Sequence, residues 1–258
     1  MTQEEYDKLK ALNCTGAKLI LRSPKLYKHW LDNKTENDED TPALRMGRLI
    51  HLATLQPDLY DAKIAIAPPC DRRTKDGKEI WSNFVNTLKD GQEIVTQSES
   101  EMITSIAISA KEGIDIVTKD VGSDVKRYAE KVVVAKHNGI DIKGRPDFWC
   151  GDIVIDIKST QDAKSFGRDV VNYKYFMQSA WYLNLTKAKK FYFVAVEKTA
   201  PFDFAIYTLD DEALAEGQKL MDKACAIYGE CNLFKSFPGY SKEIQTLSLP
   251  KWALNSEM

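Results

Sequence analysis

The sequence predicts an α/β fold in which helices flank a central mixed β-sheet, and three features of the chain support this. Residues 138–160 read as two antiparallel strands, with Asn138-Gly139 as a tight turn ahead of the first. In the stretch 152–158, isoleucines alternate with mostly charged residues. This period of two is typical of a strand whose two faces meet different surroundings. Helical periodicity fills much of the chain on either side of this segment.

The other elements follow in order along the chain. Residues 2–31 read as helices, the acidic run 33–40 reads as a solvated loop, and Thr41 caps a helix over 43–56. Next we expect a short strand at 63–67, a basic loop with a turn at Asp76-Gly77, a helix at 79–90, and a helix to about Lys111 that starts with a capping box of Ser98 and Glu101. A meander of three strands follows, at 127–136, 139–149 and 152–158. The chain then gives helices at 162–171 and 173–185, a hairpin of strands 191–197 and 202–209, and a last helix from Asp210 or Asp211 to about Tyr228.

At 258 residues the chain could form one large domain or two small ones. It shows no internal repeat, low-complexity tract or flexible linker, so we expect one domain over residues 1–258, with a helical extension at 1–40, a core at 41–228 and a tail at 229–258. The chain begins with polar and charged residues, so we expect no signal peptide, and no apolar run is long enough to span a bilayer. The five cysteines form no regular framework, which favours a reducing cytoplasm. The net charge of −2 gives no overall attraction to nucleic acid, so any DNA contact needs a local basic surface.

Three charged residues of the meander lie where a metal ion would be useful. Asp156 and Lys158 share the strand face opposite the isoleucines, and covering them is costly unless something pairs with them. Folding the chain at Cys150-Gly151 brings Asp147 beside Asp156. Two carboxylates at one point repel, and a divalent cation relieves that repulsion. Lys158 would then be placed to hold the attacking water or the charge developing on a phosphate.

Each local pattern also has an ordinary structural reading. The spacing of Asp, eight residues, Asp, one residue and Lys is loose, because many strands carry Asp-x-Lys as a solvated cross-strand pair. A lone helix histidine such as His51 is more often structural than a metal ligand. The loop with Arg72 and Arg73 is either a solvated connection or a phosphate-binding loop, since adjacent arginines can fork onto phosphate oxygens.

Further motifs occur in a fixed order along nearly the whole chain. They are Met46-Gly47-Arg48-Leu49-Ile50-His51, Leu55-Gln56-Pro57, Ile66-Ala67-Pro68, Asp71-Arg72-Arg73-Thr74, Gly77-Lys78-Glu79, Gly144-Arg145-Pro146-Asp147, Asp156-Ile157-Lys158-Ser159-Thr160, Gln178-Ser179-Ala180-Trp181-Tyr182 and Thr246-Leu247-Ser248-Leu249-Pro250-Lys251-Trp252-Ala253. With these motifs the chain resembles the RecE-type exonucleases (exodeoxyribonuclease VIII), which belong to the PD-(D/E)xK, RecB-like nuclease superfamily. Their order and spacing are far more specific than the Asp-x-Lys pattern alone.

The resemblance implies a restriction-endonuclease-like core and a Mg2+-dependent exonuclease, with Mn2+ as a possible substitute. Such an enzyme degrades one strand of linear double-stranded DNA from its 5′ end. The remaining 3′ single-stranded tail then serves a RecT-like annealing protein in phage or prophage recombination, inside a bacterial cell. RecE-type enzymes are ring-shaped homotetramers, so the resemblance also implies a homo-oligomer.

The resemblance implies roles for single residues as well. His51, Asp147 and Asp156 would hold the metal together with the backbone carbonyl of Ile157, and Lys158 would activate the water. Gln178 and Tyr182 match the helical Gln-x-x-x-Tyr motif that contacts the substrate strand, and their spacing puts them on one helix face. The candidate DNA contacts are Arg72, Arg73 and Arg145, and the candidate additional acidic residue is Glu130.

Two other functions stay open on the sequence alone: a structure-selective endonuclease on the same core, and a DNA-binding scaffold without turnover. The intact set of His51, Asp147, Asp156 and Lys158 argues against the scaffold. The cysteines contain no close Cys-x2-Cys pair, so we expect no iron–sulfur cluster. No Gly-x4-Gly-Lys-Ser/Thr motif occurs, so we expect no use of ATP.

Overall fold

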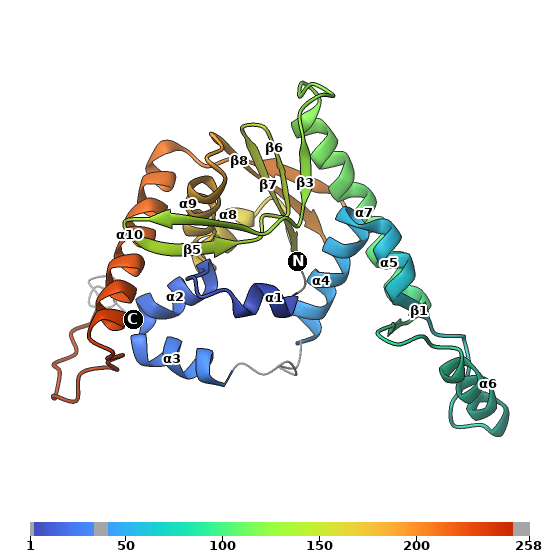
Figure 1. Ribbon diagram of the computed structural model, residues 1–258. Coiled ribbons are helices and arrows are strands. Elements are labelled where there is room, and N and C mark those ends of the chain that lie inside the picture. Colours follow the sequence, from blue (N-terminus) through green and yellow to red (C-terminus); the bar gives the residue numbers. More distant parts are fainter. Residues whose placement is uncertain (1–2, 34–40, 250–258) are drawn as a thin grey trace, which may run out of the picture.

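The computed structural model describes residues 3–33 and 41–249, which form a central β-sheet with helices on both faces (Figure 1). The sheet has five strands in the order β3-β6-β7-β8-β9. Strands β7 and β8 are parallel and the other neighbouring pairs are antiparallel, so the sheet is mixed, which confirms the predicted fold class. The strands are β3 (Arg127–Ala129), β6 (Phe148–Cys150), β7 (Ile153–Thr160), β8 (Lys190–Glu197) and β9 (Phe204–Tyr207).

Strand β7 lies at the centre of this sheet and is covered on both faces. Ile155 and Ile157 pack in one core cluster with helices α4 (Pro42–Leu55) and α7 (Gln97–Thr118). Val154 packs on the opposite face of the strand, in a cluster with Phe166 and residues of helix α9 (Tyr175–Thr186). The alternation that predicted this strand therefore separates two buried layers, and β7 extends two residues beyond the expected end.

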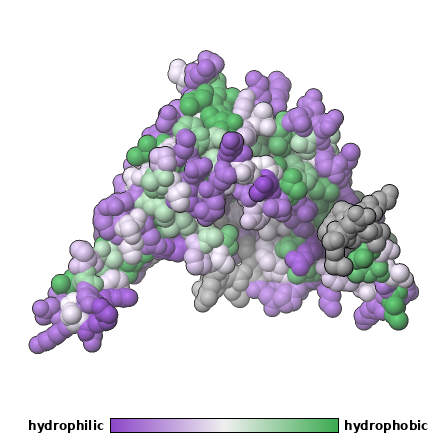
Figure 2. Space-filling model, turned by 180° about the vertical axis from the view of Figure 1, so that it is seen from behind, coloured by the Kyte–Doolittle hydropathy of each residue, from purple (hydrophilic) through white to green (hydrophobic). Residues whose placement is uncertain are grey.

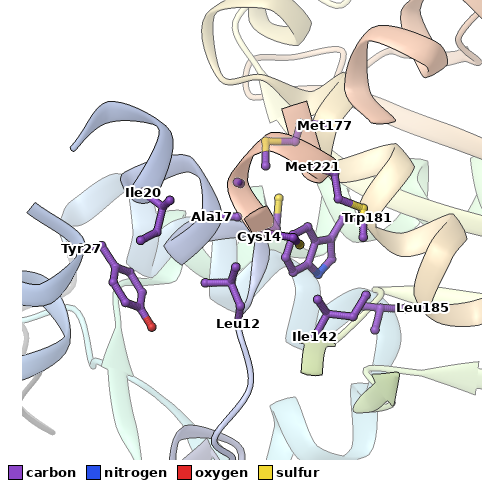
Figure 3. Packing of buried hydrophobic residues seen from close by; sticks show 12 residues of the cluster. Leu12, Cys14, Ala17, Ile20, Tyr27, Ile142, Met177, Trp181, Leu185 and Met221 are labelled. Carbon is purple, nitrogen blue, oxygen red and sulfur yellow. The ribbon is translucent and has the colours of Figure 1, made fainter. Parts of the chain in front are cut away.

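Helices of the N-terminal part of the chain share a layer with the last helices. Trp181 is fully buried there and donates its indole N–H to the carbonyl of Lys143 at 3.0 Å. Figure 3 shows side chains such as Leu12, Ile142 and Met221 gathered around it, so the N-terminal helices share a core with the rest of the fold. The helices other than α4 and α7 are α1 (Gln3–Lys8), α2 (Cys14–Arg22), α3 (Pro24–Asp32), α5 (Pro57–Lys63), α6 (Lys75–Asn86), α8 (Phe166–Asn172), α9 (Tyr175–Thr186) and α10 (Asp211–Leu233).

The predicted hairpin of strands 127–136 and 139–149 is wrong in its continuity, because the structure divides it into two ladders. Strands β4 (Val133–His137) and β5 (Ile140–Gly144) form a two-stranded sheet of their own, whereas β3 and β6 join the central sheet. Glu130, with a left-handed φ of 51°, separates β3 from β4. Between β5 and β6 stands a proline, which has no N–H for a ladder hydrogen bond.

The tight turns that were predicted in this region are present. Asn138 and Gly139, between β4 and β5, have φ angles of 47° and 81°, as a two-residue hairpin turn requires. Gly151, between β6 and β7, has a φ of 50°. The order of the strands along the chain is therefore correct even where their lengths are not.

The turn expected at Asp76-Gly77 is wrong, because α6 begins at Lys75 and includes both residues in its first turn. Gly77 is needed there for a close approach: a Cβ at this position would lie 1.9 Å from the carbonyl oxygen of Asp71. Two short strands, β1 (Ile64–Ile66) before α6 and β2 (Glu93–Val95) after it, pair in parallel, and β2 was not predicted.

Two helix starts also differ from the prediction. The capping box of α7 is formed by Thr96 and Glu99, two residues before the expected pair, because both pairs fit the pattern and the earlier one makes the bonds. Helix α8 begins at Phe166, since residues up to Thr160 continue β7. The expected loop at 33–40 lies outside the described residues except for Asn33, which caps α3. Of the described helices, none is long and apolar enough to cross a membrane.

Candidate active site

Asp147 and Asp156 meet across the pair of strands β6 and β7. The register places Phe148 opposite Ile155, so the next residues outward, Asp147 and Asp156, are neighbours. Both are buried, at 5% and 0% exposure. The backbone N–H of Ile157 donates a 2.7 Å hydrogen bond to Oδ2 of Asp147. The turn at Gly151 thus brings the two carboxyl groups of the sequence motif to one place.

His51 reaches the same place from helix α4. Its Nε2 lies 3.0 Å from the carbonyl oxygen of Ile157, and its Nδ1 lies 3.4 Å from Oδ1 of Asp147. These contacts join a helix to two strands that are about a hundred residues further along the chain. The imidazole ring therefore lies among the oxygen atoms that the sequence predicted as metal ligands.

Glu130 completes this cluster. Its Oε1 lies 3.7 Å from Nδ1 of His51, and its backbone N–H donates to the carbonyl of Asp147 at 2.9 Å. The left-handed backbone at Glu130 ends β3 and directs the chain past the site. One ligand atom from each of His51, Glu130 and Asp147 lies within 4.8 Å of the others. Glu130, which the sequence analysis named only as a candidate additional acidic residue, is thus the residue that the structure groups with His51 and Asp147.

Asp156 is held from two other directions. Lys158, on the same face of β7, forms an ion pair with its Oδ2, and Gln178 from α9 donates to its Oδ1 at 2.9 Å. The ammonium group of Lys158 also lies 4.7 Å from the ring centroid of Tyr175. Tyr175 was not predicted from the sequence. The signal that could have found it is the run Tyr173-Lys174-Tyr175, which combines aromatic and basic residues at the start of a helix.

Tyr182 lies one helical turn after Gln178 and is fixed by close packing. A Cβ on Gly144 would lie 3.0 Å from Cε1 of Tyr182 and 2.5 Å from Cδ1 of Leu185. Gly144 therefore lets α9 approach β5 closely. Burial first, and then the nearby carboxylates of Asp156 and Asp147, raise the pKa of Tyr182 well above its usual range, so its hydroxyl stays protonated.

The electrostatics of the cluster favour positive charge. Burial alone would lower the pKa of His51, but the carboxylates of Asp147 and Glu130 raise it to about 10. Burial would likewise lower the pKa of Lys158, and the carboxylates of Asp156 and Asp147 raise it instead. Burial raises the pKa of Asp156 to about 6, against the opposing effect of Lys158. A group of buried carboxylates that stabilises cations in this way is suited to a metal ion.

Arg145 lies at the edge of the cluster. Its Nη1 is 3.9 Å from Oε2 of Glu130, and its guanidinium carbon is 5.2 Å from the ring centroid of Tyr6. Its Nη2 is buried and has no hydrogen-bond partner within residues 3–33 and 41–249. A buried donor without a partner is costly, so this atom is a candidate to bind an acceptor such as a phosphate oxygen.

The structure does not bring Arg72 and Arg73 to the cluster. They stand just before α6, which projects away from the sheet in Figure 1 and forms a mainly hydrophilic arm in Figure 2. Arg72 lies over the ring of Trp81, 4.4 Å from its centroid, and Arg73 pairs with Asp71 at 2.9 Å. Both are exposed, so their predicted contact with DNA would be made some way from the buried carboxylates.

The residues present fit a divalent cation. Nδ1 of His51 faces the carboxylates of Asp147 and Glu130, the carbonyl of Ile157 lies at the other ring nitrogen, and such oxygen-rich donor sets are typical of Mg2+ and Mn2+ sites. Asp156 lies beside Asp147, but its own carboxylate oxygens bond to Lys158 and Gln178. Its role as a further ligand stays a prediction.

The fold and this cluster together define a domain of the PD-(D/E)xK type, as the sequence motif predicted. Residues 13–250 match the family described as "PDDEXK-like domain of unknown function (DUF3799)", and the chain belongs to this family. No curated protein matches the chain.

One solved structure agrees with the assignment of the fold. A presumed exonuclease from Eubacterium rectale aligns with a TM-score of 0.63 and 13% identity, covering 100% of this chain and 99% of that one. At this identity the similarity shows the fold alone. An alkaline exonuclease from Laribacter hongkongensis aligns at 0.34 with 16% identity (70% and 96% coverage), and a phage related exonuclease from Haemophilus somnus at 0.35 with 14% (90% and 100%). These two similarities are too weak to support an argument.

Proposed function

We propose that this protein is a metal-dependent exonuclease that degrades one strand of linear double-stranded DNA from its 5′ end and leaves a 3′ single-stranded tail. The observation that carries the proposal is the cluster of His51, Glu130 and Asp147 beside the ion pair of Asp156 and Lys158. A cation site next to a buried lysine is suited to metal-assisted hydrolysis of a phosphodiester. The strand polarity rests on the resemblance to the RecE-type exonucleases.

The residues divide into those that would hold the ion and those that would act on the DNA. His51, Asp147, Asp156 and the carbonyl of Ile157 would hold Mg2+, with Glu130 as a further acidic group. When bound, the ion lowers the pKa of a water and polarises the phosphate. The ammonium of Lys158 would orient the attacking water and offset charge that develops on the phosphate.

The other polar groups would position the substrate strand. Gln178 holds the carboxylate of Asp156 in place, and Tyr182 lies beside it on the same helix. The buried, unpartnered Nη2 of Arg145 supports a contact with a phosphate oxygen close to the cluster. Arg72 and Arg73 would contact the duplex further along, through the arm that α6 forms.

The wider biological role is also proposed on the resemblance. The 3′ tail would serve a RecT-like single-strand annealing protein in phage-type recombination, in the cytoplasm of a bacterial host. A ring-shaped homotetramer would keep the enzyme on its DNA without ATP. Residues 1–258 would act as one domain, because the N-terminal helices share a core cluster with α9 and α10.

The most direct test compares linear DNA with covalently closed circular DNA in Mg2+. We expect the enzyme to degrade the linear duplex, to release a 5′ label early and a 3′ label late, and to leave the circle intact. The Asp156→Asn variant serves as the inactive control. Cutting of the circle would favour a structure-selective endonuclease, and binding without cutting, in Mg2+ and in Mn2+, would favour a scaffold.

A further inference from the structure

An exposed aromatic side chain lies next to the reaction centre. Tyr173, in the connection between α8 and α9, has 58% of its surface exposed. Its ring nevertheless stacks on Tyr175, with centroids 5.5 Å apart and planes inclined by 29°. Large aromatic rings at the surface usually bury more of themselves, so a ring held in place but left open is suited to bind something flat.

Tyr175 connects this exposed ring to the site. The ammonium of Lys158 lies 4.7 Å from its centroid. Its ring also packs on Phe166, with centroids 5.9 Å apart, and on Phe193, with centroids 6.0 Å apart, both of which are buried in the core cluster under the sheet. Tyr173 therefore stands on a rigid base, one aromatic ring away from the lysine that is proposed to act on the phosphate.

A second lysine lies at the same ring. Lys18 comes from α2, far away in the sequence, and its Nζ donates to the carbonyl of Tyr173 at 2.7 Å and lies 5.7 Å from the centroid of Tyr175. No carboxylate of residues 3–33 and 41–249 lies within ion-pair distance of Lys18. A partly buried ammonium without a carboxylate partner, beside an aromatic ring, is suited to bind an anion.

The ordinary structural reading is that Lys18 only fastens the connection between α8 and α9. That role accounts for its bond to the carbonyl of Tyr173, but it explains neither the open face of Tyr173 nor the lysine in place of a neutral donor. The two features together match the way proteins hold unpaired nucleic acid, in which aromatic rings stack on bases and basic groups contact the backbone.

We propose that Tyr173, Tyr175 and Lys18 form a subsite for one nucleotide of a single DNA strand next to the bond that is cut. The base stacks on the open face of Tyr173, and a phosphate of that strand bonds to Lys18. A base inside a duplex cannot stack in this way, so the strand must be unpaired at this point. This inference rests on the proposed nuclease function, because it places the subsite beside Lys158.

The first test measures binding of a short, fluorescently labelled oligothymidylate in Ca2+, which supports binding without hydrolysis. Tyr173→Ala should weaken binding roughly five- to 150-fold, the loss expected for one base–aromatic stack, and Tyr173→Phe should retain it. Tyr240→Ala, which removes an exposed tyrosine after α10, is the matched control and should bind like the wild type.

Lys18 is tested through salt. Lys18→Met should reduce the slope of log affinity against log salt by about 0.7, the value for one phosphate contact with a single strand, and Lys18→Arg should retain the slope. Lys189→Met removes an exposed lysine that pairs with Asp152 at the other end of β7, and it should leave the slope unchanged.

A third measurement compares linear duplexes with paired and with unpaired 5′ ends. The wild type should cut the unpaired end faster, and Tyr173→Ala should lose that preference. Wild-type binding by Tyr173→Ala, or an equal loss in Tyr173→Phe, would overturn the subsite while the nuclease function stands. A wild type that binds the oligothymidylate through Tyr173 but cuts no DNA would overturn the nuclease function, and Tyr173 would then belong to a binding site for single-stranded DNA with no bond to cut.

Discussion

The side-chain amide of Gln178 donates a 2.9 Å hydrogen bond to Oδ1 of Asp156, while Lys158 pairs with Oδ2 of the same carboxylate. The carboxylate is thus held by α9 on one side and by its own strand on the other. Helix α9 is itself packed closely on β5 through Gly144. The orientation of Asp156 at the candidate metal site therefore depends on a helix that contributes no ligand.

Replacing Gln178 by methionine should separate positioning from folding. Gln178→Met keeps the length of the side chain but removes the hydrogen bond, so we expect roughly 10- to 100-fold lower activity, the usual cost of losing a group that orients a ligand. The Mg2+ concentration for half-maximal activity should rise, while the melting temperature changes little. Gln97→Met, at the exposed start of α7, is the control, and an unchanged Mg2+ dependence in Gln178→Met would contradict this role.

The share of Glu130 in the cation site can be measured by calorimetric titration with Mn2+. We expect His51→Ala to abolish measurable binding and Glu130→Gln to weaken it by about tenfold or more, because a neutral amide is a poorer ligand for a hard cation. Glu216→Gln, which alters an exposed residue of α10, should bind like the wild type. Wild-type affinity in Glu130→Gln would show that its closeness to His51 is incidental.

The pairing of Asp147 with Asp156 could be predicted because both depend on local rules, the period-two pattern of a strand and the turn at Gly151. The strand lengths could not, since the left-handed backbone at Glu130 divides a segment whose residues would also suit one long strand. That same break places Glu130 at the site. Lys18 and Tyr173 meet only through tertiary packing, across 155 positions of sequence, and no local pattern relates them.

Two glycines should respond in opposite ways to alanine. At Gly144 a Cβ would lie 2.5 Å from Leu185 and 3.0 Å from Tyr182, so Gly144→Ala should lower the free energy of unfolding by about 1–3 kcal/mol. At Gly47, inside α4, nothing lies within 4 Å of the new Cβ, and Gly47→Ala should raise it by about 0.5–1 kcal/mol. Urea unfolding measures both, and a Gly144→Ala protein as stable as the wild type would exclude the close contact.

The arginines before α6 are expected to act on binding rather than on hydrolysis. If both contact phosphates, the double variant Arg72→Ala with Arg73→Ala should reduce the salt slope of duplex binding in Ca2+ by about two, close to one for each lost contact. Single-turnover cleavage at saturating enzyme should change little, because neither residue lies in the buried cluster. A salt slope equal to that of the wild type would show that the loop is a solvated connection without phosphate contacts.

Lys158→Met tests the central claim, metal-assisted hydrolysis at this cluster, most directly. Asp156 loses its buried partner in this variant, so some loss of stability is expected, and duplex binding in Ca2+ serves as the check that the fold and the DNA site remain. Single-turnover cleavage of an end-labelled linear duplex in Mg2+ is then measured beside the wild type. The account predicts retained binding with cleavage slower by about two to four orders of magnitude. Cleavage near the wild-type rate would contradict it.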